Sequence, residues 1–301
     1  MWCYYFFDLP LVALRQKMPN RPSRIIKMHQ EEIAKIHHGY KILCRSLHKP
    51  FSTAEADEVI QKALLVKMVA ESDAYSPLRM SKNHLDSYFT VHGMENLAPL
   101  LNGGRPVILL SAHTGSFVMS PIALQSAGIP AYIIARKFSP SSEGHSAKQL
   151  YLSLYHKLLN IRFPVKFIYT DFAGNIDRTL MSAFSKNGVI FTLIDLPRSL
   201  YPYKRLPVSL FNCPSSLPSG FIRWSLRKNA VFLTVWNTID VDPSGRFMRT
   251  LTIDSPIKDS LQIPEILQAY ADRLSSLIVK QPWQWLALQM LDQYIEETDI
   301  L

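Results

Sequence analysis

Residues 104–136 constrain the fold of this chain more than any other segment. The apolar run Val107 to Leu110 follows a Gly-Gly-Arg-Pro turn and predicts a buried strand. The polar residues 113–116 come next, and the apolar stretch Phe117 to Ala127 is long enough for a helix. A second apolar run, Ala131 to Ala135, completes a strand–helix–strand unit. Because open α/β sheets bind ligands at the carboxyl ends of their strands, we expect a site at residues 113–116.

The rest of the chain predicts a mixed, mostly parallel central sheet flanked by helices. Short apolar runs at 189–194 and 231–236 read as further strands of this sheet. Two helical patterns, at about 23–48 and 52–72, precede it, and the second begins with a Ser-Thr-Ala-Glu capping box. We therefore expect an apolar segment and helical preface over residues 1–85 and an α/β domain over 86–301, together one compact unit.

The composition indicates an acidic partner, because the formal net charge is +9. The positive charge would suit any of four negatively charged partners: an anionic lipid surface, a phosphorylated substrate, an acidic carrier protein or nucleic acid. The chain has no recognition-helix pattern and no repeated basic-aromatic strands, so nucleic acid is not an expected partner. The cysteines are three in number and far apart, which indicates a reducing compartment.

The first fourteen residues are apolar and aromatic, but Asp8 and Pro10 interrupt them. This stretch is too short to span a bilayer, which needs about 20 residues of helix. Two interpretations remain open at this point. The aromatic start and the basic residues behind it could rest at a membrane interface, or the segment could pack on the protein core.

Two motifs resemble a known family. The segment Ser111-Ala112-His113-Thr114-Gly115-Ser116-Phe117 resembles the strand end and histidine loop of the lysophospholipid acyltransferase superfamily, in particular its lipid A late-acyltransferase (lauroyl/myristoyl transferase) branch. Pro282-Trp283-Gln284-Trp285 resembles the closing signature of the same branch. The resemblance extends from about Tyr88 to Trp285 and implies a fold like that of glycerol-3-phosphate acyltransferase. One position departs from it. In the branch the histidine is followed by four residues and then an acid, and here Val118 stands at the position of that acid.

The resemblance implies an acyltransferase without a bound cofactor or metal. His113 would act as general base on an acceptor hydroxyl, which attacks an acyl thioester carried by acyl carrier protein or coenzyme A. Arg136 would stabilise charge, and Thr114, Gly115 and Ser116 would bind substrate. The expected location is the cytoplasm, peripheral on the inner face of the bacterial inner membrane, where the acceptor would be a lipid.

Val118 leaves three explanations open. Another acid could reach His113 from a different strand, with Asp195 the leading candidate and Asp171 or Asp177 behind it. Asp195-Leu196 keeps the acid of an Asp-Gln pair found in the resembled branch. The acceptor could instead be an amine, as in aminoacyl transfer to lipid A, which needs less help from a base. The chain could also be a catalytically inactive relative that binds lipid or a partner.

Other chemistry finds little support in the sequence. The histidines of the helical preface, His29, His37, His38 and His48, have no companion acids at metal-ligand spacing. Neither serine beside His113 lies in a nucleophile-elbow pattern, which argues against a covalent serine mechanism. A Walker loop and a dinucleotide fingerprint are also missing.

Overall fold

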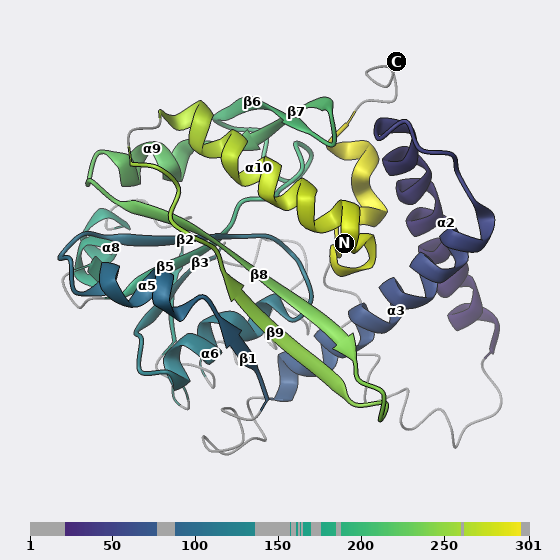
Figure 1. Ribbon diagram of the computed structural model, residues 1–301, viewed down its shortest axis with the longest axis horizontal. Coiled ribbons are helices and arrows are strands. Elements are labelled where there is room, and N and C mark those ends of the chain that lie inside the picture. Colours follow the sequence, from purple (N-terminus) through teal and green to yellow (C-terminus); the bar gives the residue numbers. More distant parts are fainter. Residues whose placement is uncertain are drawn as a thin grey trace, which may run out of the picture.

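A computed structural model describes residues 22–76, 88–135, 157, 161, 163, 165–169, 176–184, 188–259 and 262–295. A central sheet crosses the molecule, with helices on both of its faces and a helical pair at one end (Figure 1). Several expectations fall outside the described residues. They include the apolar segment 1–14, Arg136 and Asp171.

Within the described part of the chain, the central sheet has seven strands in the order β1-β9-β8-β2-β5-β3-β4. These are β1 (Thr90–His92), β2 (Val107–Ser111), β3 (Ala131–Ala135), β4 (Lys166–Tyr169), β5 (Val189–Leu193), β8 (Val231–Val241) and β9 (Phe247–Ile253). Neighbouring strands are parallel except β8 and β9, which form an antiparallel pair. The expectation of a mixed, mostly parallel sheet within an α/β fold is therefore confirmed.

Strand β2 lies at the centre of the sheet and is buried along its whole length. Its side chains alternate between the two faces, as strand geometry requires. Ile108 and Leu110 belong to a core cluster that includes α10 (Ile263–Lys280), whereas Val107 and Leu109 belong to one that includes α6 (Ser120–Ser126). Coverage of both faces explains why the run is continuously apolar in the sequence.

The remaining helices of the α/β body surround this sheet. They are α5 (Met94–Leu101), the 3-10 turn η3 (Phe117–Met119) that leads into α6, α8 (Ile176–Phe184) and α9 (Gly220–Leu226). The helix expected over Phe117 to Ala127 is thus present as a 3-10 turn followed by an α-helix. Pro121 lies in the first turn of α6, where its missing N–H costs no helical hydrogen bond.

A separate hairpin lies against α10. It consists of β6 (Arg205–Leu210) and the antiparallel β7 (Cys213–Pro218). The residues between them, Phe211 and Asn212, both have positive φ, as a tight two-residue hairpin turn requires. The second strand of this pair has little strand propensity of its own, because proline and serine are poor strand formers.

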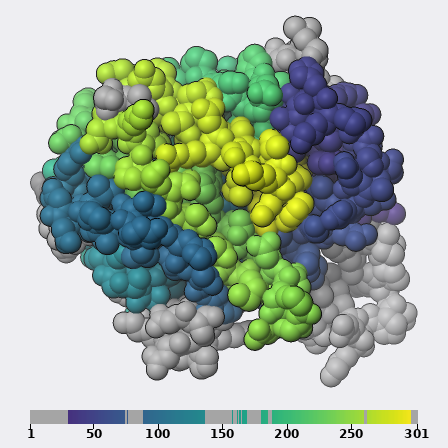
Figure 2. All heavy atoms as spheres, in the orientation of Figure 1, coloured from purple at the N-terminus to yellow at the C-terminus, as the bar shows by residue number. Residues whose placement is uncertain are grey.

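The helical preface packs on the C-terminal part of the chain. Helix α2 (Pro22–Ser46) contacts the 3-10 segment η5 (Leu288–Gln293), and α3 (Thr53–Tyr75) contacts η4 (Pro282–Gln284) and η3. A Cβ atom at Gly39 of α2 would collide with the carbonyl oxygen of Leu288. Figure 2 shows the C-terminal residues wedged between the preface and the α/β body. The domain division at residue 85 stays a prediction.

Among the described residues, no helix is long and apolar enough to cross a membrane. The same part of the chain has no group of three or more His, Cys, Asp or Glu side chains placed to hold a metal ion.

Candidate active site

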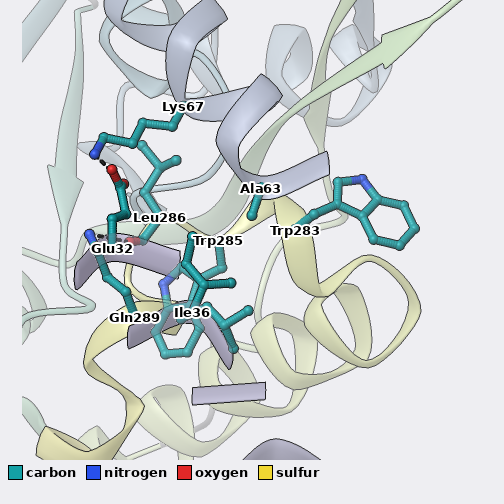
Figure 3. A pocket seen from close by; sticks show the side chains of 9 residues that line it. Glu32, Ile36, Ala63, Lys67, Trp283, Trp285, Leu286 and Gln289 are labelled. Atoms are coloured by element: carbon teal, nitrogen blue, oxygen red, sulfur yellow. Dashed lines mark hydrogen bonds and ion pairs between the residues drawn. The ribbon is translucent and has the colours of Figure 1, made fainter. Parts of the chain in front are cut away.

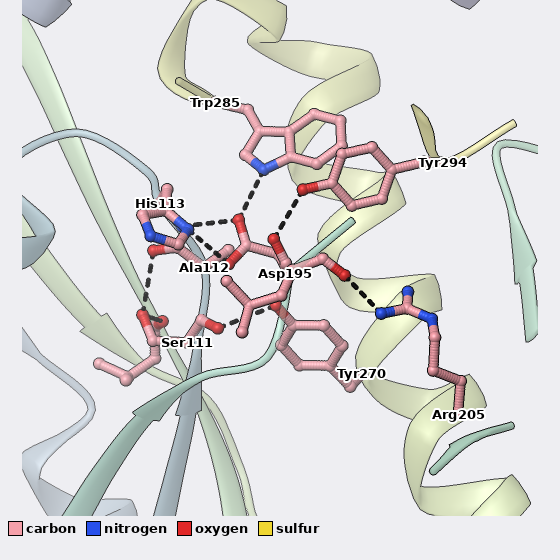
Figure 4. A network of polar contacts seen from close by, with 10 residues as sticks. Ser111, Ala112, His113, Asp195, Arg205, Tyr270, Trp285 and Tyr294 are labelled. Atoms are coloured by element: carbon pink, nitrogen blue, oxygen red, sulfur yellow. Dashed lines mark hydrogen bonds and ion pairs between the residues drawn. The ribbon is translucent and has the colours of Figure 1, made fainter. Parts of the chain in front are cut away.

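The ends of β2 and β5 bring His113 and Asp195 together (Figure 4). The two strands are parallel neighbours with Ser111 opposite Leu193, so the residues two positions further along each chain meet at the same edge of the sheet. His113 Nδ1 lies 2.8 Å from Asp195 Oδ1, and the backbone N–H of His113 donates to Oδ2 at 2.8 Å. The expected carboxylate contact with His113 is therefore present in the structure.

Asp195 is fully buried and held in place by several donors. Besides the two contacts with His113, its Oδ2 accepts a hydrogen bond from Trp285 Nε1 at 2.9 Å. Its backbone carbonyl accepts one from the hydroxyl of Tyr294 at 2.6 Å. A buried carboxylate is costly unless it is hydrogen-bonded. Here Oδ2 accepts from two N–H groups, and Oδ1 faces the Nδ1 atom of His113. The position of Asp195 is thus fixed independently of any ligand.

The contact with Asp195 determines which of the two ring nitrogens of His113 carries the proton when the ring is neutral. An ionised carboxylate can only accept hydrogen bonds, so the neutral ring must carry its proton on Nδ1. Nε2 then carries the lone pair of the neutral ring, as a base requires. The His113 side chain is 16% exposed, and its ring meets that of Phe117 edge-on with the centroids 4.8 Å apart. The arrangement matches the histidine–carboxylate half of a catalytic triad.

Two buried tyrosines support the edge of the sheet beneath this pair. Tyr270 donates to the carbonyl of Ser111 at 2.9 Å, and Tyr294 donates to that of Asp195. Burial, and then the negative charge of Asp195, raises the pKa of each phenol well above its ordinary value. Both phenols therefore remain protonated donors. Arg205 holds the chain just beyond, donating to the carbonyl of Leu196 at 2.8 Å.

The backbone of the loop after His113 is bonded to the closing segment of the chain. Leu286 N–H donates to the carbonyl of His113 at 2.9 Å, and Gly115 N–H donates to that of Gln284 at 2.9 Å. Thr114 forms an isolated bridge with Trp285. The motif around Trp285 is thus the direct neighbour of the histidine loop, which explains how two motifs so far apart in sequence act on one site.

Strand β8 contacts the same loop from the other neighbour of β2. Val235 lies opposite Ser111, so β8 continues past the end of β2, and Asn237 N–H donates to Thr114 Oγ1 at 3.2 Å. Gly115 has φ +44°, and a Cβ atom there would lie 2.7 Å from the carbonyl oxygen of Asn237. Only glycine fits this position without distortion.

Thr114 and Ser116 are fully buried, and their hydroxyls bond within the protein. Thr114 accepts from β8, and Ser116 donates to the carboxylate of Asp73 on α3. These contacts give the two hydroxyls a part in holding the loop. Substrate binding by Thr114, Gly115 and Ser116 stays a prediction.

The other predicted residues are placed as follows. Val118 is half-buried and packs in the core cluster on the α6 face of the sheet. Arg136 and Asp171 lie outside the described residues, as does the side chain of Asp177. Asp195 is therefore the only one of the three candidate acids for which a contact with His113 can be described. Its strand-end position was the signal in the sequence that identified it.

The sequence did not reveal the remaining polar neighbours. The indole of Trp285 belongs to a recognised motif, but the motif does not say that it donates to Asp195. The contact between Asp73 and Ser116 joins residues 43 positions apart, and no pattern in the sequence links them.

A small cavity, partly lined by Trp285, lies between the helical preface and residues 283–289 (Figure 3). The apolar side chains of Ile36, Ala63 and Leu286 line it, and the Lys67–Glu32 ion pair lies at its margin. Its volume is about 20 Å³, enough for roughly one water molecule. It cannot hold an acyl chain in this conformation.

The model of a family described as bacterial lipid A biosynthesis acyltransferase matches residues 50–291. The match includes α3, the His113 loop, Asp195 and the closing segment with Trp285. A search of curated proteins gives no match.

Proposed function

Because this chain belongs to the bacterial lipid A biosynthesis acyltransferase family, we propose that it moves an acyl group from a thioester donor to a lipid. The acceptor group is a hydroxyl or an amine of a lipid or lipid-like molecule. Acyl carrier protein or coenzyme A carries the thioester, which is a co-substrate, so the proposed reaction uses no bound cofactor or metal. The observation that carries the proposal is the contact between His113 Nδ1 and the buried Asp195 carboxylate.

His113 acts as the general base in this reaction. Its Nε2 removes the proton of the acceptor hydroxyl as that oxygen attacks the carbonyl carbon of the thioester. The carbon–sulfur bond then breaks, and the imidazolium returns the proton to the departing thiolate. An imidazole can both accept and donate a proton, so one side chain can serve both steps.

Asp195 orients the ring and stabilises the imidazolium that forms during the reaction. This supports the first of the three explanations for Val118, in which an acid from another strand does the work of the missing motif acid. An inactive relative would not need a buried carboxylate aimed at a partly exposed histidine. An amine acceptor, as in aminoacyl transfer to lipid A, is compatible with the same pair and is distinguished by the product.

Arg136 is proposed to stabilise the negative charge that develops on the substrate. In sequence it follows Ala135, the last residue of β3, and β3 runs parallel to β5, whose carboxyl end lies at the edge of the sheet next to His113. A cation at that edge suits an oxyanion or a phosphate.

The protein is proposed to work at the inner face of the bacterial inner membrane, as a peripheral protein. A lipid acceptor requires contact with the membrane, and the net charge of +9 favours an anionic surface or an acidic carrier protein. No role for nucleic acid is proposed.

Mass spectrometry of lipids tests the proposal. Total lipids are compared between bacteria that express wild type, His113→Ala, Asp195→Asn or His92→Ala. His92 is an exposed histidine of β1 and controls for the loss of an imidazole. We expect a new acylated lipid in cells with wild type or His92→Ala and its loss with His113→Ala. Mild alkaline hydrolysis then separates acceptors, because esters are cleaved and amides resist.

Two results would overturn the proposal. One is a new lipid that persists in His113→Ala cells, which would exclude His113 as the base. The other is the failure of purified wild type to acylate lipid extracts from its native membrane with both carrier-protein and coenzyme A thioesters, which would favour the inactive relative.

A further inference from the structure

A second buried carboxylate, that of Asp73, contacts the histidine loop from the helical preface. Asp73 is near the end of α3 and is fully buried. It accepts hydrogen bonds from Ser116 Oγ in the loop and from the hydroxyl of Tyr88 at 2.5 Å. Arg249 on β9 donates to it twice, through Nε at 2.6 Å and Nη2 at 2.8 Å. One side chain thus joins α3, β9 and the loop.

Arg249 fixes the orientation of this carboxylate. The two parallel N–H donors of a guanidinium match the two oxygens of a carboxylate and hold it in one plane. The guanidinium also lies over the ring of Tyr88, with its carbon 4.0 Å from the ring centroid. Because Asp73 is held at both oxygens, the Ser116 hydroxyl has a rigid acceptor.

Stability alone is a weak reason for this pair. The Arg249 side chain is 10% exposed and that of Asp73 is not exposed, so both charges are removed from water. Well-packed apolar residues often replace such pairs without loss of stability. The geometry of the pair, aimed at the residue three positions after His113, points to a role in the site.

We propose that Asp73, held by Arg249, is a positioning residue for His113. Asp195 fixes the start of the loop through the backbone N–H of His113, and Asp73 fixes its other end through Ser116. Together they keep Nε2 where the acceptor proton must be taken. The effect on rate rests on the proposed function, whereas the effect on the His113 ring does not.

Three variants test the inference. Ser116→Ala removes only the link between the pair and the loop, and it leaves the contacts of Asp73 with Arg249 and Tyr88 in place. Asp73→Asn weakens the pair itself. Glu32→Gln is the matched control, because Glu32 and Lys67 form another buried ion pair, between α2 and α3, whose side chains are 4% and 15% exposed.

Two readouts separate positioning from general stability. The first is the NMR signal of the proton on His113 Nδ1, assigned among the nine histidines by its loss in His113→Ala. The second is kcat and KM for the acylated product. We expect Ser116→Ala and Asp73→Asn to broaden or shift the Nδ1 signal and to lower kcat about 100-fold with KM nearly unchanged, since a misplacement of about 1 Å costs that much. Glu32→Gln should lower the melting temperature without either effect.

The inference is wrong if Ser116→Ala keeps the wild-type Nδ1 signal and kcat, or if Glu32→Gln alters the Nδ1 signal as much as Asp73→Asn does. If Asp73→Asn does not fold, Ser116→Ala decides alone. If wild type transfers no acyl group, the proposed function fails, but the NMR comparison still decides whether Asp73 positions His113.

Discussion

Replacement of Asp195 by asparagine should reverse the protonation of the His113 ring. Asp195 Oδ2 accepts from two N–H groups that are fixed by the fold, His113 N at 2.8 Å and Trp285 Nε1 at 2.9 Å. In Asp195→Asn the amide oxygen must take this place, because an amide nitrogen there would face two donors. The amide nitrogen then replaces Oδ1 and points at His113 Nδ1.

An N–H donor facing Nδ1 requires Nδ1 to carry the lone pair. The proton of the neutral ring then lies on Nε2, which can no longer act as a base. In serine proteases the same exchange lowers the rate about 10⁴-fold through the wrong tautomer, equivalent to about 5 kcal/mol in the activation free energy. The free energy of unfolding should change by no more than about 1 kcal/mol. The backbone N–H of His113 and the indole N–H of Trp285 still donate to an oxygen, and the new amide N–H donates to His113 Nδ1.

The assay measures single-turnover transfer of a labelled acyl group by purified wild type, Asp195→Asn and Asp195→Ala, together with their melting temperatures. Alanine removes the acceptor of the Trp285 indole and of the His113 backbone, and each buried unsatisfied donor costs about 1–3 kcal/mol. We therefore expect Asp195→Ala to be both slow and unstable, and Asp195→Asn to be slow but stable. Transfer by Asp195→Asn within tenfold of the wild-type rate would refute the reasoning.

Three further changes test other parts of the structure. Gly115→Ala should lower the free energy of unfolding, measured by urea titration, by at least about 2 kcal/mol. The reason is that residue 115 has a positive φ and that an added Cβ atom would clash with the carbonyl oxygen of Asn237. An unchanged unfolding midpoint would contradict this loop geometry. Trp285→Phe keeps an aromatic ring but removes a donor to Asp195, so we expect about 2 kcal/mol lower stability and roughly a tenfold slower transfer; a loss as large as that of Asp195→Asn would be unexpected. Burial and the hydrogen bond to Asp73 raise the pKa of Tyr88 from its ordinary value of 10 to about 12. The folded state therefore holds the proton of Tyr88 more tightly than the unfolded state does. The protonated hydroxyl contributes its full stabilisation below pH 10, and this contribution is lost as the pH rises towards 12. Urea titrations across that range should show a shallower decline for Tyr88→Phe than for wild type.

The sequence predicted the elements that decide where the His113 loop lies. The apolar runs of β2 and β5 are buried on both faces, so their patterns were clear, and parallel pairing places their carboxyl ends together. The strand end at Asp195, together with the resemblance to the Asp-Gln pair of the late-acyltransferase branch, made Asp195 the leading candidate among three acids for a contact with His113. The capping box at Ser52 was equally informative, since its hydroxyl accepts from the N–H of Glu55 at the start of α3.

The contacts that hold the site could not be predicted, because they depend on tertiary packing. The Asp73–Arg249 pair spans 176 positions, and neither residue lies in a recognisable motif. The second strand of the hairpin, β7, was missed because the residues Cys213–Pro218 have little strand propensity. Pairing with β6 and packing against α10 override that local preference.

We propose that Asp195 does for His113 what the acid replaced by Val118 does in the resembled branch. Nitrogen-15 NMR of the His113 ring in wild type near neutral pH tests it most directly. We expect the neutral form of the ring to carry its proton on Nδ1, with a proton signal that disappears in Asp195→Ala. A wild-type ring protonated on Nε2 alone would contradict it, because such a ring could not act as the proposed base.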